Sequence, residues 1–202
     1  MVRKLLTGNA SQTEYALLLR NLLPAYEAME SQLDALAKSH AVAPIRDPRL
    51  YRAAAIRADL AALCGNGWED LPLTVSGREY GLRVRSLQPR QGCRIAGHCY
   101  TRYLGDLSGG QILRGLLSRK PGLPAAAMNF FRFDVPGDPG AYKVHYIQAL
   151  NSITDDRREM DAIVDEAVTA FRLNIALSEE LASLRVQSGD GGSGVSGTSG
   201  TR

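Results

Sequence analysis

One glycine-bearing stretch decides the fold of this 202-residue chain: Tyr100-Thr101-Arg102-Tyr103-Leu104-Gly105-Asp106-Leu107-Ser108-Gly109-Gly110-Gln111. Apolar residues at helical spacing flank it, which predicts a long helix over about 92–119. Each glycine inside a helix costs roughly 0.5–1 kcal/mol relative to alanine. Such a costly pattern predicts either close packing or a simple break, or a helix that bends and brings bare backbone against a flat ligand.

The carboxylate of Asp106 lies within this pattern. Gly105 and Gly109 are four residues apart and therefore share a helix face, and Asp106 lies next to that face. One hypothesis is that Asp106 fixes a water near a bound ligand and delivers protons through it. The other is that Asp106 forms a surface salt bridge with Arg102, worth less than about 1 kcal/mol. The residues alone leave both open.

The rest of the chain indicates an all-α domain. Ser11 and Glu14 form a capping-box pattern at the start of a helix that runs to about residue 38. No segment alternates convincingly as a strand does. Residues 1–8 resemble the end of a helix stopped by Gly8, and the Gly/Ser-rich residues 187–202 predict a disordered tail after a helical domain of 1–186. Further helices are expected at about 48–63, within 71–88, and at 139–153 and 155–185.

Composition narrows the function classes. The net charge of +3 comes with scattered basic residues, so we expect no nucleic-acid partner. No apolar run of about 18 residues occurs, so we expect no membrane association. The three cysteines form no CxxC pair, which favours a reducing cytoplasm. We expect a cytoplasmic monomer.

Several catalytic site types are disfavoured by their missing motifs. The chain has no HExxH, no paired ExxH, no GxSxG, no phosphate-binding loop and no cysteine–histidine zinc spacing, so we predict no metal held by protein ligands alone. Three histidines remain as candidate ligands. His40 is expected at the surface, and His98 and His145 are expected to be packing residues.

Residues 98–111 resemble the signature of the heme oxygenase family, in its biliverdin-producing, bacterial-type form. The similarity extends over about 1–186 and includes 26–30, 149–152 and 165–175. It implies a single-domain, multi-helix bundle that holds heme between a proximal helix and a kinked, glycine-rich distal helix. The implied reaction cleaves heme, which is both substrate and cofactor, to biliverdin, CO and ferrous iron. It needs O2 and an external electron donor, a reductase or a ferredoxin.

The resemblance also assigns site residues. Gly105 and Gly109 would face the heme, and Asp106 would hold a distal water network with Arg102 and Asn174 in its outer reach. The remaining pocket residues would be Phe171 on the wall, with Tyr100 and Lys143 near a propionate. A second propionate-binding arginine of the family corresponds here to Ile147, and Arg172 is a candidate substitute.

One departure concerns the proximal histidine, whose family position would fall before Met1. We expect a misassigned start, a truncated chain, or a natural variant that binds heme poorly or binds another tetrapyrrole. The alternative function is therefore a non-catalytic heme- or bilin-binding homologue. A helical scaffold without cofactor is a third hypothesis, but it does not explain three helix-destabilising glycines.

Overall fold

The structure, a computed structural model, describes residues 10–119 and 122–189. The expected helix end at 1–8 lies outside the described residues. The expected tail at 187–202 lies outside them from residue 190 on, while residues 187–189 belong to the last helix.

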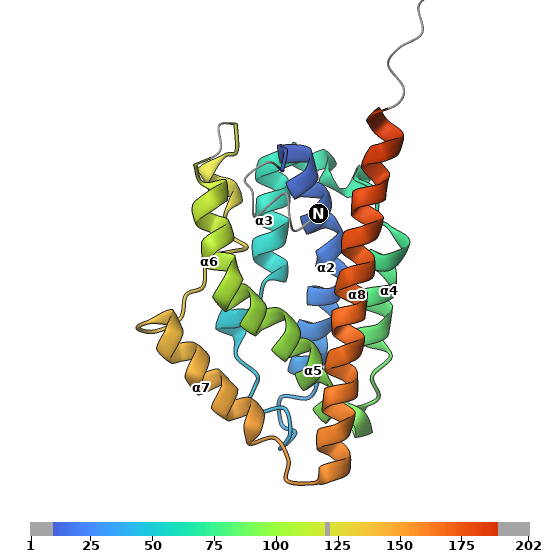
Figure 1. Cartoon of the computed structure of the whole chain (residues 1–202). Helices are drawn as coiled ribbons and strands as arrows, with labels where there is room; N and C mark the ends of the chain where they lie inside the picture. The colour runs from blue at the N-terminus through green and yellow to red at the C-terminus, as the bar shows by residue number, and fades with distance from the viewer. Residues whose placement is uncertain (1–9, 120–121, 190–202) are drawn as a thin grey trace, which may run out of the picture.

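The described residues form helices without a strand (Figure 1). The α-helices are α2 (Gln12–Ala35), α3 (Ala53–Cys64), α4 (Val75–Arg85), α5 (Ile95–Cys99), α6 (Gly105–Leu117), α7 (Pro139–Asn151) and α8 (Arg157–Gly189). Short 3-10 turns are η1 (Pro48–Leu50), η2 (Gly65–Asp70), η3 (Pro89–Arg94) and η5 (Ala125–Ala127). The all-α prediction is confirmed, and so is the capping box, in which Glu14 N–H donates to Ser11 Oγ at 3.2 Å.

The helix expected over 92–119 is not one regular helix. It consists of η3, α5, the π-helical turn η4 (Tyr100–Leu104) and α6. A π turn holds one extra residue, which shifts the helix faces and commonly bends the axis. Figure 1 shows the segment changing direction between α5 and the end of α6. The irregular turn therefore ends where the glycines begin, and α6 starts at Gly105.

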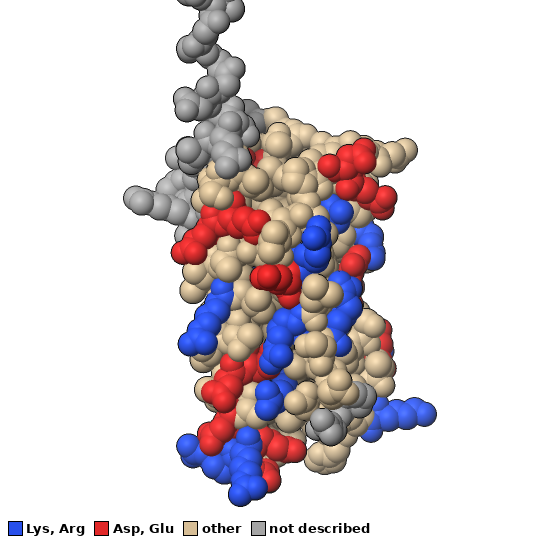
Figure 2. All heavy atoms as spheres, turned by 90° about the vertical axis from the view of Figure 1, so that its right-hand side faces the viewer, with Lys and Arg blue, Asp and Glu red and all other residues tan. Residues whose placement is uncertain are grey.

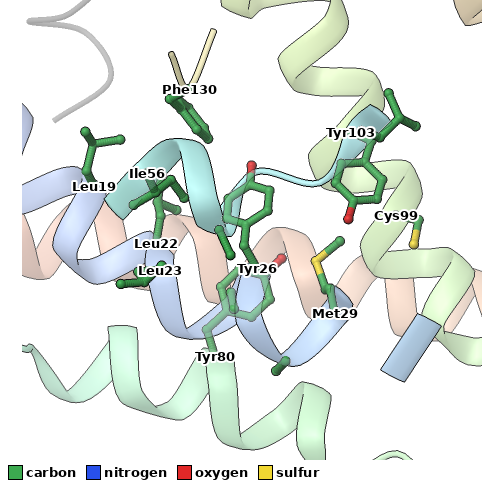
Figure 3. Packing of buried hydrophobic residues seen from close by; sticks show 14 of the residues in the cluster. Leu19, Leu22, Leu23, Tyr26, Met29, Ile56, Tyr80, Cys99, Tyr103 and Phe130 are labelled. Atoms are coloured by element: carbon green, nitrogen blue, oxygen red, sulfur yellow. The ribbon is translucent and has the colours of Figure 1, made fainter. Parts of the chain in front are cut away.

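Helix α2 forms the centre of the core and packs against α4 and α3. Large fully buried side chains from distant segments meet around it, as Figure 3 shows for Tyr26, Met29, Tyr80 and Tyr103. Pro24 lies buried inside α2 without ending it. The core of one domain thus fixes the positions of the helices that carry the candidate site residues.

Helices α5 and α8 cross with their backbones in contact. A Cβ added to Gly97 would lie 2.6 Å from the backbone nitrogen of Ala167 and 2.8 Å from the carbonyl oxygen of Ile163. Only glycine permits this approach, because neither neighbouring atom belongs to a flexible side chain. The crossing sets where the following turn of α8, with Phe171 and Asn174, lies relative to α6.

The outer surface carries mixed charge. On the face seen in Figure 2, basic and acidic side chains are interspersed. Within residues 10–119 and 122–189, no helix combines the length and the apolarity needed to cross a bilayer. The three cysteines are free thiols; Cys93 and Cys99 are buried and Cys64 is exposed.

Candidate functional site

A cavity of about 270 Å³ lies against the glycine-bearing face of α6. Its walls come from α2, α8 and the segment before α7, and its lining is mainly apolar, with Leu18, Leu22, Phe130, Phe131, Phe171 and Leu177 among the lining residues. A second hollow of about 350 Å³ shares Thr101, Gly105 and Phe171 with the first. The backbone at Gly105 thus borders two adjoining hollows, an arrangement that suits a flat apolar ligand.

The three glycines have different surroundings. No atom outside the helix lies within 4 Å of a Cβ built on Gly105 or Gly109. A Cβ on Gly110, in contrast, would lie 3.2 Å from the Phe131 ring. Gly105 and Gly109 therefore face open space along the cavity, whereas Gly110 makes room for an aromatic ring.

Asp106 lies at the inner edge of this cavity in a network of buried polar groups. Its carboxylate accepts a hydrogen bond from the Tyr26 hydroxyl and contacts the Arg102 guanidinium at 3.4 Å. Arg102 also donates to the Tyr26 oxygen at 2.9 Å and to Asn174 Oδ1 at 2.6 Å. The Asn174 amide donates to the Tyr80 hydroxyl at 3.3 Å. The structure thus brings the predicted residues Asp106, Arg102 and Asn174 together.

The burial of the Arg102–Asp106 pair excludes one of its two interpretations, the surface salt bridge. The side chains are 15% and 10% exposed, so the pair is not a surface salt bridge. Burial raises the pKa of Asp106 above its ordinary value, while the charge of Arg102 and the hydrogen bond from Tyr26 oppose the rise. A carboxyl group with a raised pKa, held beside a cavity by charged and hydroxyl partners, is suited to passing protons.

Sequence reasoning gave no role to two members of this network, Tyr26 and Tyr80. Tyr26 lies in α2, where the sequence predicts a place on the apolar face and within the similar segment 26–30. Tyr80 lies in α4, where the sequence pattern is ambiguous. Both are fully buried hydroxyl-bearing side chains. A buried tyrosine needs a hydrogen-bond partner for its hydroxyl, which is the signal that could have pointed to them.

The second hollow carries the residues expected at a carboxylate. Its lining contains Tyr100, Lys143 and Ile147. Within the described part of the chain, the half-buried Lys143 ammonium has no ion pair or hydrogen bond. Arg172 is exposed and lines neither hollow. The lining therefore offers one cation, Lys143, and the guess that Arg172 substitutes for an arginine at 147 finds no support.

None of the three histidines lines these hollows. His98 is fully buried, and its Nε2 lies 2.9 Å from Glu166, which Arg83 also contacts at 2.9 Å. Burial opposes ionisation of Glu166, but the hydrogen bonds from His98 and Arg83 lower its pKa to about 2. His98 thus joins α5 to α8 as the expected packing residue, and His40 is exposed as expected. The expectation that His145 is a packing residue is wrong, because its side chain is exposed on α7.

Comparison with known proteins gives one consistent result. Residues 1–180 match the family model described as Heme oxygenase. Heme oxygenase 1 of Synechocystis sp. is 33% identical over 181 residues, which cover 89% of this chain and 75% of the relative. Human heme oxygenase 1 is 32% identical over 187 residues, which cover 91% of this chain and 65% of the relative.

Solved structures agree with the sequence matches. The Synechocystis heme oxygenase-1 structure in complex with heme superposes with a TM-score of 0.85 at 32% identity, covering 93% of this chain and 85% of that one. The heme oxygenase structure from Leptospira interrogans gives 0.82 at 32% identity, covering 89% and 88%. The predicted helical fold of this family is confirmed.

Proposed function

The chain belongs to the heme oxygenase family, and from this premise we propose that it cleaves heme to biliverdin, CO and ferrous iron with O2 and external electrons. The observation that carries the proposal is the combination of an open glycine face with a buried carboxylate network at its edge. A Cβ built on Gly105 or Gly109 would meet no atom outside the helix within 4 Å. Asp106 lies beside this open space, where it accepts a hydrogen bond from Tyr26 and contacts Arg102. Heme supplies the oxidative chemistry when it is bound.

The chain's own residues fit a porphyrin in three ways. The bare backbone at Gly105 and Gly109 allows a flat ring to approach within van der Waals contact. The apolar walls, with Phe130 and Phe131 among their residues, offer the ring a nonpolar surface. The Lys143 ammonium and the Tyr100 hydroxyl border the second hollow, where a propionate would find a cation and a hydrogen-bond donor.

The proposed role of Asp106 is to hold and transfer a proton. Its carboxylate is fixed by Tyr26 and Arg102, so its orientation toward the cavity does not depend on a ligand. Asn174 orients Arg102 from α8. The network thus links α2 and α8 to the segment formed by η4 and α6. Its groups are in place before a ligand binds, which is what a proton donor beside a substrate requires.

The proposal is tested with hemin and an external nitrogen ligand, because no histidine of the chain lines the hollows. We expect hemin to produce a Soret band in the presence of the protein, and added imidazole to sharpen and shift it. With ascorbate and O2, the complex should yield biliverdin and CO. A mixture of hemin, imidazole and ascorbate without protein is the control for uncatalysed oxidation. If the complex forms but makes no more biliverdin than this control, the enzymatic proposal fails.

The second candidate function is a heme- or bilin-binding protein without turnover. The observation that favours it is the lack of a histidine among the residues that line the hollows. It predicts tight binding of hemin or biliverdin together with background O2 consumption, both with and without imidazole. The same experiment therefore separates the two functions.

The single cation of the second hollow leads to a prediction about affinity. Lys143→Ala should weaken binding of protoporphyrin IX about tenfold, because an ion pair with a partly desolvated carboxylate is lost. Ile147→Arg should strengthen it by a similar factor, since it adds a cation one turn along α7. Fluorescence titration measures both, and porphyrin dimethyl ester is the control ligand that neither substitution should affect.

A further inference from the structure

The aromatic wall opposite the glycine face is formed by an irregular segment, residues 129–132, between η5 and α7. Phe130 and Phe131 of this segment line the first cavity and are 3% and 2% exposed. Irregular backbone satisfies few of its own hydrogen bonds, here the one from the Arg132 N–H to the Asn129 carbonyl oxygen at 3.0 Å. Other groups must therefore fix its position. The partners of these backbone groups identify what fixes the wall.

Two N–H groups of the segment, those of Asn129 and Phe130, are held by one buried carboxylate. Asp59 of α3 is 0% exposed and accepts hydrogen bonds at 2.8 Å from the backbone N–H groups of Asn129 and Phe130. It also accepts the Asn129 side-chain amide at 2.8 Å. The Tyr15 hydroxyl, at 3.4 Å, completes its partners. All acceptor capacity of Asp59 is thus directed at the wall and at α2.

The carbonyl groups of the same segment are held by a buried guanidinium. Arg52 precedes α3 by one residue and is 6% exposed. It donates to the carbonyl oxygens of Asn129 and Phe130 at 3.5 and 3.4 Å and also to that of Arg132. The guanidinium carbon lies 4.1 Å from the centre of the Phe133 ring. Arg52 at the N-cap of α3 and Asp59 within α3 are seven residues apart, about two helical turns, so both reach the same side of the helix.

The remaining carbonyl group of residues 129–132, that of Phe131, connects the segment to α6. Gln111 of α6 donates to the Phe131 carbonyl oxygen at 2.9 Å, and the Phe131 ring lies against Gly110. On the other side, the Phe130 ring meets the Tyr26 ring edge-on at 5.7 Å between centres. Figure 3 labels both residues. Tyr26 in turn donates to Asp106. The wall therefore contacts both the glycine helix and the proton network.

From these contacts we infer that Asp59 and Arg52 are positioning residues that hold the aromatic wall at a fixed distance from α6 and so set the orientation of the bound tetrapyrrole. Neither residue lines the two hollows, so both act through Phe130 and Phe131. The inference rests on the proposed function for the identity of the ligand. It does not depend on turnover, because the wall shapes the cavity for any porphyrin.

The test uses protoporphyrin IX and the full chain. Its readouts are binding affinity and the circular dichroism of the bound porphyrin in the Soret region, which depends on how the ring lies relative to nearby aromatic side chains. Arg52→Lys keeps the charge but loses the planar fork that contacts several carbonyls. Asp59→Asn keeps the shape but replaces an acceptor oxygen by a donor. Each variant should bind about three- to tenfold more weakly, as expected for a lost buried hydrogen bond, with an altered Soret dichroism.

The controls separate orientation from folding. Asp34→Asn changes an exposed aspartate that pairs with Arg46, and it should leave both readouts unchanged. Phe131→Leu changes the wall but leaves Arg52 and Asp59 in place, and it should reproduce the altered dichroism. If Asp59→Asn fails to fold, Arg52→Lys still tests the inference. Folded Arg52 and Asp59 variants with wild-type affinity and dichroism would overturn the inference. Wild-type protein that binds porphyrin but forms no biliverdin would overturn the proposed function alone.

Discussion

Asp106→Ala is expected to lower the rate of biliverdin formation by roughly 100-fold or more, the typical contribution of a positioned proton donor. The substitution removes the carboxylate that accepts the Tyr26 hydroxyl and contacts Arg102 beside the cavity. Heme consumption should continue without biliverdin, because the substrate remains bound while controlled proton delivery is lost. Single-turnover spectra, with biliverdin quantified by chromatography, measure the effect.

The matched control for this substitution is Asp161→Ala. Asp161 also pairs with an arginine four residues earlier, Arg157, but these side chains are 63% and 86% exposed. Its loss should change neither activity nor the free energy of unfolding beyond about 0.5 kcal/mol. Asp106→Ala should instead destabilise the fold by about 1–3 kcal/mol, because the Tyr26 hydroxyl loses its acceptor in the core. An unchanged biliverdin yield in folded Asp106→Ala would refute the role proposed for this carboxylate.

Gly109→Leu is expected to make the protein more stable while abolishing porphyrin binding. A Cβ at this position meets no atom within 4 Å, so the fold accepts the side chain, and replacing a helical glycine should add roughly 0.5–1 kcal/mol to the free energy of unfolding. The leucine would project into the space where a porphyrin ring would lie. Binding should weaken by roughly 100-fold or more, since a tightly packed ligand and the new side chain cannot share one volume.

Gly115→Leu on the same helix is the matched control. Gly115 also has open space around it but lines neither hollow. It should show the gain in stability, measured by thermal and urea denaturation, without a change in porphyrin affinity. If Gly109→Leu binds protoporphyrin IX as tightly as the control, the porphyrin does not bind against the face of α6 that carries Gly105 and Gly109. The proposed function then loses its main support.

Local sequence patterns predicted most of the helices and singled out the glycine-bearing segment 100–111 as a candidate site. Apolar periodicity and the Ser11–Glu14 cap located α2 correctly, because these signals arise within a few residues along the chain. The family resemblance named Asp106, Arg102 and Asn174 in advance. Their roles stay predictions, although the structure brings them together.

By itself, the sequence determined the all-α class, the cost of the glycines at 105, 109 and 110, and the candidate carboxylate beside them. Only the tertiary structure decided which glycines face open space, that the Arg102–Asp106 pair is buried, and that Tyr26 and Tyr80 join it. It also decided that Arg52 and Asp59 hold the segment that forms the opposite wall. The physical reason is the sequence separation of the contacts. Helix periodicity and capping act over a few residues, whereas the contacts of Tyr26, Tyr80, Arg52 and Asp59 join groups 71 to 94 residues apart, and only the packing of the whole core brings them together.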